Sequence, residues 1–199
     1  MWNKIYKKDS SFFGDEQSNF ASSCHITIKE KKNLLELGCG QGRDCLFFAS
    51  KGINVTAIDS SIIAIDQLSK RANDMKLEIT TIEYDISKRL PFDDNAFDVV
   101  YSHMFFSMGF QWKELEFIFD EVKRVLRNDG YHFFSVRNQN DKFYGTGIKK
   151  GEIHEINNFK IRFFTKQEIE RLAKGFKILE IKEDYEEPVT LYLVSSKKE

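Results

Sequence analysis

Cysteine and proline are scarce in this chain, with three cysteines and two prolines among 199 residues. Cys24, Cys39 and Cys45 have neither the spacing of a metal site nor the even number of a disulfide framework. We therefore expect no metal centre and no disulfides. Thiols that stay free indicate a reducing compartment, which predicts a cytoplasmic protein.

The sequence also lacks long apolar runs. Its first residues, MWNKIYKKDSSFFGDE, do not contain the apolar core of a signal peptide. No run approaches the roughly 20 apolar residues that cross a bilayer. We therefore expect no membrane insertion.

Neither sign of charge is in excess. Lys plus Arg number 30 and Asp plus Glu number 31, which gives a formal net charge of −1. No global positive field is available to hold a phosphate backbone, so a nucleic acid partner is not expected. A transfer or ribosomal RNA substrate stays open.

Apolar material for a core is plentiful. Hydrophobic residues make up 41% of the chain and include nineteen Phe, and the length fits one domain. From residue 33 onward, short apolar runs alternate with amphipathic segments, a pattern typical of a parallel sheet with crossover helices. The expected strands are 33–37, 54–59, 77–85, 97–102, 131–136, 176–184 and 189–196, and the expected helices are 42–52, 60–75, 112–130 and 165–175. The short YEEP connection at 185–188 permits only antiparallel pairing of the last two strands.

Three glycines follow the first expected strand, and an aspartate ends the second. At Gly38, Gly40 and Gly42 the backbone can approach a ligand closely, and the free N–H groups of the next helix point at it. Asp59 stands at the carboxyl edge of the sheet, where a carboxylate can accept both hydroxyls of a ribose. The pair predicts a nucleoside-bearing cofactor. A dinucleotide fingerprint, G-x-G-x-x-G, would need glycine where Arg43 stands.

Further motifs follow in order: LLELGCGQGRD, AIDSS, YDISKRLPFDDNAFDVVYS and EVKRVLRNDGYHFFSV. With them, residues 33–137 resemble the class I S-adenosylmethionine-dependent methyltransferases, in particular small members such as the tellurite-resistance methyltransferases and the methyltransferase domains of types 11 and 25. The resemblance implies an α/β fold, a three-layer α-β-α Rossmann-like sandwich whose seven-stranded, mostly parallel sheet has an antiparallel C-terminal strand. It also implies S-adenosylmethionine as cofactor and S-adenosylhomocysteine as product.

The resemblance assigns cofactor contacts to individual residues. Glu36 through Gly42 would wrap the methionine end, Asp59 would bind the ribose hydroxyls, and Ser60 would flank the adenine. Asp85 would accept a hydrogen bond from the adenine amino group, or it is a turn residue ahead of ISKRLP. The implied cofactor-binding set is Glu36, Gly38, Cys39, Gly40, Gly42, Asp59, Ser60, Asp85, Ile86 through its backbone N–H, and Ser102 beside the methionine moiety.

A general base is needed only if the methyl acceptor arrives with its proton. His103 and Tyr101, at the end of the fourth expected strand, are the candidate catalytic residues. For His103 the alternative of a hydrogen-bonded structural histidine stays open. A soft anion, such as a thiolate or a reduced chalcogen oxyanion, would need no base.

Two peripheral segments are expected to select the acceptor. Residues 1–30 carry aromatic side chains among polar ones, and the resemblance implies a cap over the cofactor pocket. Residues 138–164 exceed ordinary loop length and predict a substrate-side insertion. The candidate substrate contacts are Trp2, Tyr6, Phe106, Tyr144 and His154, with ordinary packing or solvated loop positions as the alternative.

Together these features predict one methyltransferase domain over residues 1–199. It would transfer a methyl group to a small-molecule acceptor by in-line displacement, as a monomer or a homodimer. Two other functions stay open, an NAD(P)-dependent oxidoreductase and a non-catalytic module that binds S-adenosylmethionine.

Overall fold

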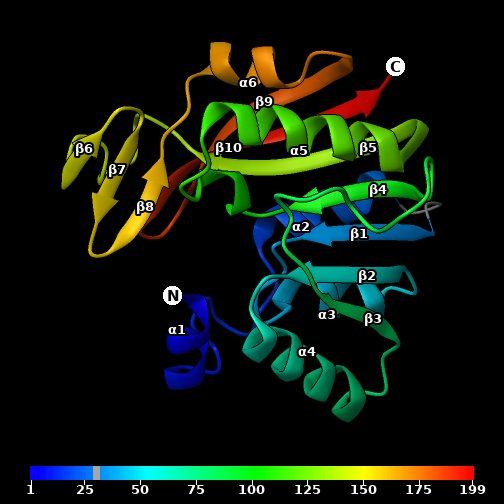
Figure 1. Ribbon diagram of the computed structural model, residues 1–199. Helices are drawn as coiled ribbons and strands as arrows, with labels where there is room; N and C mark the ends of the chain where they lie inside the picture. Colours follow the sequence, from blue (N-terminus) through cyan, green and yellow to red (C-terminus); the bar gives the residue numbers. More distant parts are fainter. Residues whose placement is uncertain (29–31) are drawn as a thin grey trace.

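The computed structural model describes residues 1–28 and 32–199 (Figure 1). Its main sheet has seven strands in the order β3-β2-β1-β4-β5-β10-β9. The strands are β1 Asn33–Leu37, β2 Asn54–Asp59, β3 Ile79–Glu83, β4 Phe97–Ser102, β5 Leu126–Arg137, β9 Phe176–Glu186 and β10 Val189–Lys198. The first five pair in parallel, and β10 is antiparallel to both of its neighbours. This confirms the predicted sheet.

Helices cover both faces of the sheet. They are α1 Trp2–Lys8, α2 Asn19–Thr27, α3 Arg43–Ser50, α4 Ile62–Asp74, α5 Trp112–Val125 and α6 Lys166–Leu172, with a short 3-10 turn, η1, at Phe105–Ser107. Successive side chains of a strand point to opposite faces. In β1, Leu34 packs with α2, α3 and α4, whereas Leu35 packs with α5 and α6. The predicted three-layer sandwich is therefore confirmed.

Local sequence signals set several of the helix ends. Ser61 caps α4 by accepting a hydrogen bond from the Ala64 N–H. Thr165 and Glu168 form the predicted capping box of α6, in which each side chain accepts from the other residue's backbone N–H. The apolar face of α5 is buried as predicted, through Leu115, Ile118, Phe119, Val122 and Val125.

Several predicted boundaries are wrong, and the largest differences lie between α5 and β5 and at β3. The helix expected over 112–130 ends at Val125, because Leu126 adopts extended backbone angles (φ −81°, ψ 134°) and pairs with Phe97 of β4. The strand β5 therefore begins five residues earlier than its apolar run at 131–136. The strand β3 is shorter than the expected 77–85 and keeps only Ile79–Glu83 paired with β2.

The expected cap and insertion lie at one end of the sheet (Figure 1). The cap contains α1, which packs on α4, and α2; residues 29 and 30 of the expected 1–30 segment lie outside the described residues. The insertion holds a second, antiparallel sheet that the sequence did not predict, with β6 Ile148–Lys150, β7 Ile153–Ile156 and β8 Phe159–Arg162. The role of residues 138–164 as a substrate-side insertion stays a prediction.

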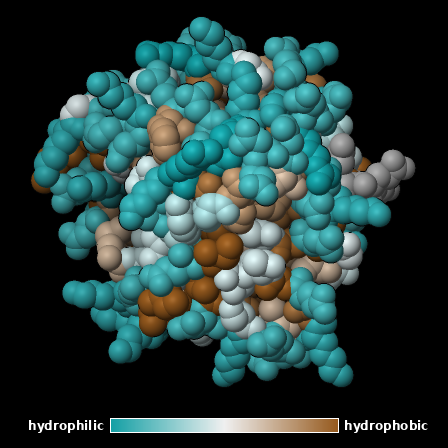
Figure 2. Space-filling view, turned by 45° about the vertical axis from the view of Figure 1, so that its right-hand side comes forward, coloured by the Kyte–Doolittle hydropathy of each residue, from teal (hydrophilic) through white to brown (hydrophobic). Residues whose placement is uncertain are grey.

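The surface is mainly hydrophilic on the face that Figure 2 shows, with one apolar area near its middle. Within residues 1–28 and 32–199, no helix is long and apolar enough to span a membrane. Over the same residues, no group of three His, Cys, Asp or Glu side chains could hold a metal ion.

A buried imidazole should make the stability of the fold depend on pH. His132 of β5 is 0% exposed, and neither ring nitrogen has a hydrogen-bond partner among residues 1–28 and 32–199. Burial lowers its pKa from 6.5 to about 3. The unfolded chain therefore binds a proton that the folded protein does not, so this contribution to stability is present above pH 6.5 and is lost as the pH falls toward 3.

We expect wild-type protein to lose about 2 kcal/mol more unfolding free energy between pH 7 and pH 5 than His132→Phe does. The phenyl ring fits this position because Phe106, Phe119, Phe134 and Phe176 already surround it. Urea unfolding at the two pH values measures the difference. His25→Phe, at a partly exposed position of α2, is the control. Equal pH dependence of wild type and His132→Phe would contradict the assignment.

Candidate active site

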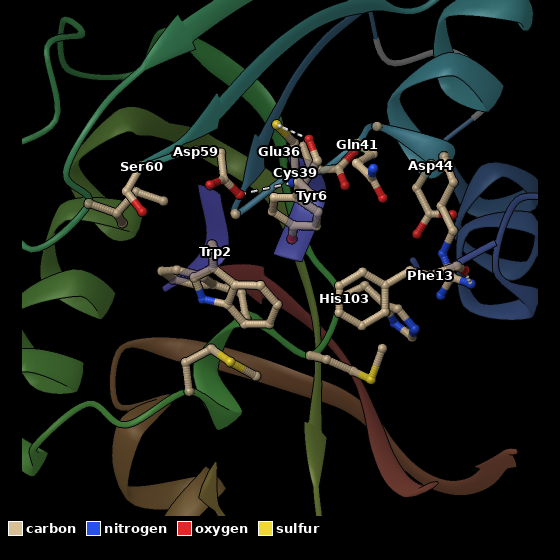
Figure 3. Close-up of a pocket in the computed structure, with 18 of the residues that line it drawn as sticks. Trp2, Tyr6, Phe13, Glu36, Cys39, Gln41, Asp44, Asp59, Ser60 and His103 are labelled. Carbon is tan, nitrogen blue, oxygen red and sulfur yellow. Dashed lines mark hydrogen bonds between the residues drawn. The ribbon is translucent and has the colours of Figure 1, made fainter. Parts of the chain in front are cut away.

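A cavity of about 210 Å³ opens at the carboxyl ends of β1, β2 and β4. This edge of a parallel sheet is where ligands of α/β proteins bind. The cap, the loop after β1, the end of β2, residues 85–87 and the segment after β4 line it (Figure 3). The predicted contacts Glu36, Gly38, Cys39, Gly40, Gly42, Asp59, Ser60, Asp85 and Ile86 all lie on its wall, as do Trp2, Tyr6 and His103.

The loop after β1 needs its glycines for backbone reasons. Gly38, Gly40 and Gly42 have φ values of 65°, 51° and 79°, a region that other residues rarely adopt. Space is limiting as well, because a Cβ at Gly42 would lie 2.2 Å from Leu68 Cδ1 of α4. This conformation turns the chain from β1 into α3 and leaves its backbone on the cavity wall.

Asp59 is tied to the glycine loop from the end of β2. Its Oδ2 accepts a hydrogen bond from the Gly40 N–H at 2.9 Å, and its Oδ1 accepts from the Ser61 N–H at 2.9 Å (Figure 3). Burial raises the pKa of this carboxyl, against the lowering effect of the backbone donors. A carboxylate has about four acceptor positions, and the backbone N–H groups do not use all of them. The remaining acceptor capacity fits a ribose hydroxyl.

Glu36 lies on the cavity wall and is bonded within the protein. It is buried, and its Oε2 accepts a hydrogen bond from the Cys45 thiol at 2.8 Å. Burial and the nearby Asp44 raise its pKa well above the usual value. Cys39 lines the cavity and donates its thiol hydrogen to the Gly40 carbonyl, which fits a small loop residue.

The cap closes the cavity above the loop. The Tyr6 hydroxyl lies 3.0 Å from where a Cβ on Gly40 would stand. Trp2 stacks on Tyr6 at a ring distance of 5.5 Å and reaches Phe159 of β8 at the same distance. The cap is held by polar bonds, since the Tyr6 carbonyl accepts from the Gln67 side chain at 2.9 Å. Cap and insertion therefore meet over the cavity.

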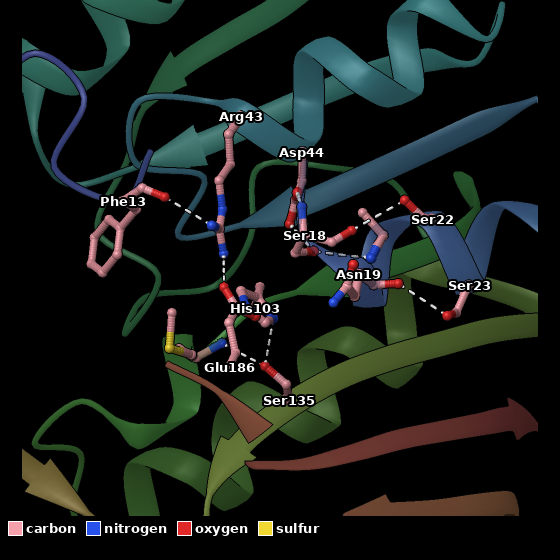
Figure 4. A network of polar contacts seen from close by, with 12 residues as sticks. Phe13, Ser18, Asn19, Ser22, Ser23, Arg43, Asp44, His103, Ser135 and Glu186 are labelled. Carbon is pink, nitrogen blue, oxygen red and sulfur yellow. Dashed lines mark hydrogen bonds and ion pairs between the residues drawn. The ribbon is translucent and has the colours of Figure 1, made fainter. Parts of the chain in front are cut away.

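His103 belongs to a polar network that joins distant segments (Figure 4). Its Nε2 lies 2.9 Å from Glu186 Oε2, and its Nδ1 lies 2.8 Å from Ser135 Oγ. Glu186 also pairs with Arg43 at 2.6 Å, and Arg43 donates to the Phe13 carbonyl at 2.8 Å. Burial alone would raise the pKa of Glu186, but His103 and Arg43 outweigh it and lower the pKa to about 2. Glu186 is therefore a carboxylate at neutral pH.

Five predicted site residues do not line the cavity. Tyr101 is fully buried and donates its hydroxyl to Asp44 at 2.7 Å. Ser102 is fully buried, and its Oγ has no hydrogen-bond partner in the part of the chain that the structure describes. Phe106 packs in the core against Phe119. Tyr144 and His154 contact each other within the insertion. The structure does not bring any of these five side chains to the cavity, so a base role for Tyr101 has no geometric support.

Asp85 makes the contacts of a turn residue, and its hydrogen bond to adenine stays a prediction. Its Oδ1 accepts from the Ser87 N–H and hydroxyl at 3.1 and 2.6 Å, as a turn residue does. It also lines the cavity.

Several residues of the wall were not predicted as site residues, chiefly Arg43, Asp44 and Phe13, and Gln41 was included only within the range Glu36 through Gly42. Gln41 holds the cap, accepting from the Phe12 N–H and donating to the Asp9 carbonyl. Arg43 was noted only as the missing third glycine of a dinucleotide motif. Its pairing with Glu186 joins residues 143 positions apart, and no local pattern indicates it.

Comparison with known proteins decides between the possible families. A family model described as a methyltransferase domain matches residues 34–130. Residues 34–130 are therefore similar to the methyltransferase domain family. The matched range contains the glycine loop, Asp59, Asp85 and His103.

Two curated relatives and one solved structure illustrate the similarity to methyltransferases. The chain is 28% identical over 112 residues to a malonyl-[acyl-carrier protein] O-methyltransferase of Salmonella typhimurium, covering 56% of this chain and 41% of the relative. It is 32% identical over 117 residues to a ubiquinone biosynthesis O-methyltransferase of Actinobacillus pleuropneumoniae, covering 57% and 49%. A SAM-dependent methyltransferase from Methanosarcina mazei superposes with a TM-score of 0.79 at 23% identity, covering 92% of this chain and 98% of that one.

The matches to the curated relatives extend over less than half of those proteins, 41% and 49% of their lengths. The superposition on the Methanosarcina protein shows the fold. The comparisons thus give the fold and a similarity to methyltransferase domains, and the acceptor is a matter of proposal.

Proposed function

We propose that this protein transfers the methyl group of S-adenosylmethionine to a small-molecule acceptor. The observation that carries the proposal is Asp59, held by Gly40 and Ser61 at the edge of a glycine loop within the range that matches the methyltransferase domain family. Similarity to two O-methyltransferases supports a small acceptor. The three cysteines are free and buried, which supports a cytoplasmic location, and we retain one domain, as a monomer or homodimer.

Different residues of the cavity would bind different parts of the cofactor. Asp59 would accept the ribose hydroxyls, and the loop from Gly38 to Gly42 would pass along the methionine end. Asp85 and Ile86 would contact the adenine from the opposite wall. When bound, the cofactor supplies a methyl group already activated on a sulfonium. The protein has to orient the acceptor and exclude water.

The cap and the segment after β4 would exclude water from the cavity. Trp2, Phe13, Met104, Phe105, Met108 and Phe110 line the cavity with apolar atoms, and we call these six residues the apolar wall. A dry wall favours attack by an acceptor that neutralises the sulfonium. The NAD(P)-dependent oxidoreductase is set aside, because the methyltransferase family match covers the glycine loop and Arg43 replaces the third glycine.

Calorimetric titration with S-adenosylmethionine and with S-adenosylhomocysteine tests the cofactor assignment. We expect binding of both and none of NAD. Folded protein that binds neither would contradict the proposed function. Binding of both without transfer to any acceptor in a broad panel would instead support the non-catalytic module.

A further inference from the structure

The histidine beside the apolar wall has no lone pair to offer a substrate. Glu186, a carboxylate, can only accept at His103 Nε2, so this nitrogen carries the ring hydrogen. In the neutral ring Nδ1 then holds the lone pair, which faces the Ser135 hydroxyl at 2.8 Å. Ser135 Oγ itself accepts from the Met104 N–H at 2.8 Å, so its hydrogen is free to go to His103. Both ring nitrogens are used inside the protein.

The other titratable groups on the cavity are no better placed to act as a base. The oxygens of Asp44 accept from the Ser18 N–H at 2.7 Å, the Ser18 hydroxyl at 2.9 Å and the Tyr101 hydroxyl at 2.7 Å. Burial raises the pKa of both Tyr6 and Cys39, so these groups keep their protons. Asp44 is therefore already bonded, and neither Tyr6 nor Cys39 can take up a proton.

The remaining charged side chains of the cavity already bind other groups. Glu36 accepts from the Cys45 thiol, Asp59 accepts from the Gly40 N–H, and Asp85 accepts from the Ser87 hydroxyl. Arg43 is a permanent cation that already donates to Phe13 and Glu186. Among the cavity residues that the structure describes, none offers a free proton acceptor at the apolar wall.

We propose that the site takes an acceptor that is already ionised in solution, an apolar molecule that carries a thiolate or a carboxylate. This inference rests on the proposed function. The lone pair of the anion forms the new bond to the methyl carbon, and the carbon–sulfur bond of the sulfonium breaks with its electron pair left on sulfur. No proton moves, and both charges disappear.

Neutral acceptors fit the same site poorly. An alcohol would have to release a proton that no described residue at the wall can take. An amine would leave a new positive charge against apolar side chains, without a free carboxylate beside it. Loss of general-base assistance costs about 10²- to 10⁴-fold in rate. The ionised acceptors should therefore exceed the neutral ones by roughly 100-fold or more.

Four acceptors on one naphthalene body test this class: the thiol, the carboxylic acid, the methanol and the methylamine. S-adenosylhomocysteine release is measured with wild-type protein at fixed S-adenosylmethionine. We expect turnover of the thiol or the acid at least about 100-fold above the methanol and the methylamine. Turnover of the thiol or of the acid shows whether the acceptor group is a thiolate or a carboxylate. Comparable turnover of the methanol or the methylamine would overturn the proposal.

The pH profile separates an ionised acceptor from an enzymic base. With ring-substituted benzenethiols of different acidity, we expect the inflection of kcat/KM to follow the pKa of each thiol, in wild type and in His103→Gln alike. His25→Gln, on the outer helix α2, is the matched control. One inflection common to all thiols and lost in His103→Gln would assign the base to His103 and refute the proposal.

Calorimetry run beside these assays keeps the two proposals apart. Failure to bind S-adenosylmethionine would count against the proposed function itself. Binding of S-adenosylmethionine with no transfer to any ionised acceptor would count against the acceptor class.

Discussion

Asp59→Ala is expected to weaken S-adenosylmethionine binding by roughly 100-fold. Hydrogen bonds to a charged group contribute about 1.5–3 kcal/mol each, so loss of two costs about 3 kcal/mol or more, close to two decades in affinity. The substitution also removes the acceptor that fixes the Gly40 and Ser61 N–H groups at 2.9 Å. Calorimetric titration of the variant beside wild type measures the change.

Two further variants separate the ribose contact from general damage. Asp66→Ala, on an exposed position of the same helix–strand unit, removes a carboxylate away from the cavity and should leave affinity unchanged. Asp59→Asn keeps one acceptor oxygen and should give an intermediate affinity. Thermal unfolding checks that each variant is folded. Wild-type affinity in folded Asp59→Ala would refute the ribose assignment.

Much of the parallel sheet could be predicted from the sequence because its strands are short, apolar and bounded by polar residues. β1, β2 and β4 have the predicted bounds, since each is buried on both faces and reads as one apolar run. The small sheet β6-β7-β8 could not be predicted. Its strands have three or four residues, and β6 is entirely exposed, so no apolar alternation marks it.

The site residues that the sequence predicted and those that it missed differ in how far apart in the sequence their contacts lie. Gly40 and Asp59 are close in sequence, and the strand–loop–helix geometry between them is local. Arg43 and Glu186 meet only because the C-terminal hairpin returns β9 to the cavity, over 143 positions. Tyr101 was misplaced by the alternation of β4, which turns its side chain toward Phe20 and Phe48 of the α2 and α3 layer.

Asp141→Ala is expected to lower the unfolding free energy by about 3–5 kcal/mol. The Asp141 side chain is 0% exposed and accepts two hydrogen bonds from Arg137, at 2.9 and 2.8 Å. It also accepts from the Phe143 N–H at 2.8 Å and the Thr190 N–H at 3.1 Å. The carboxylate thus joins the end of β5, the start of the insertion and the start of β10. Urea unfolding measures the loss of unfolding free energy, with the same dependence on urea concentration used for wild type and variant.

Glu155→Ala supplies a matched ion pair from the same insertion. Glu155 pairs with Lys150 at 2.7 Å, but the two side chains are 35% and 69% exposed. An exposed ion pair contributes little to stability, so this variant should unfold almost like wild type. Equal losses in Asp141→Ala and Glu155→Ala would contradict the assigned importance of burial.

A double variant tests why Asp141→Ala is expected to lower the unfolding free energy. If Asp141→Ala is costly because it leaves the Arg137 guanidinium buried without its counter-charge, then removing that charge as well should restore stability. Arg137 already lies over the rings of Phe143 and Phe163, at 5.2 and 5.1 Å, so an apolar side chain there has partners. We therefore expect Arg137→Met with Asp141→Ala to be more stable than Asp141→Ala alone. No recovery would mean that the backbone bonds to Phe143 and Thr190, and not the ion pair, fasten the insertion to the sheet.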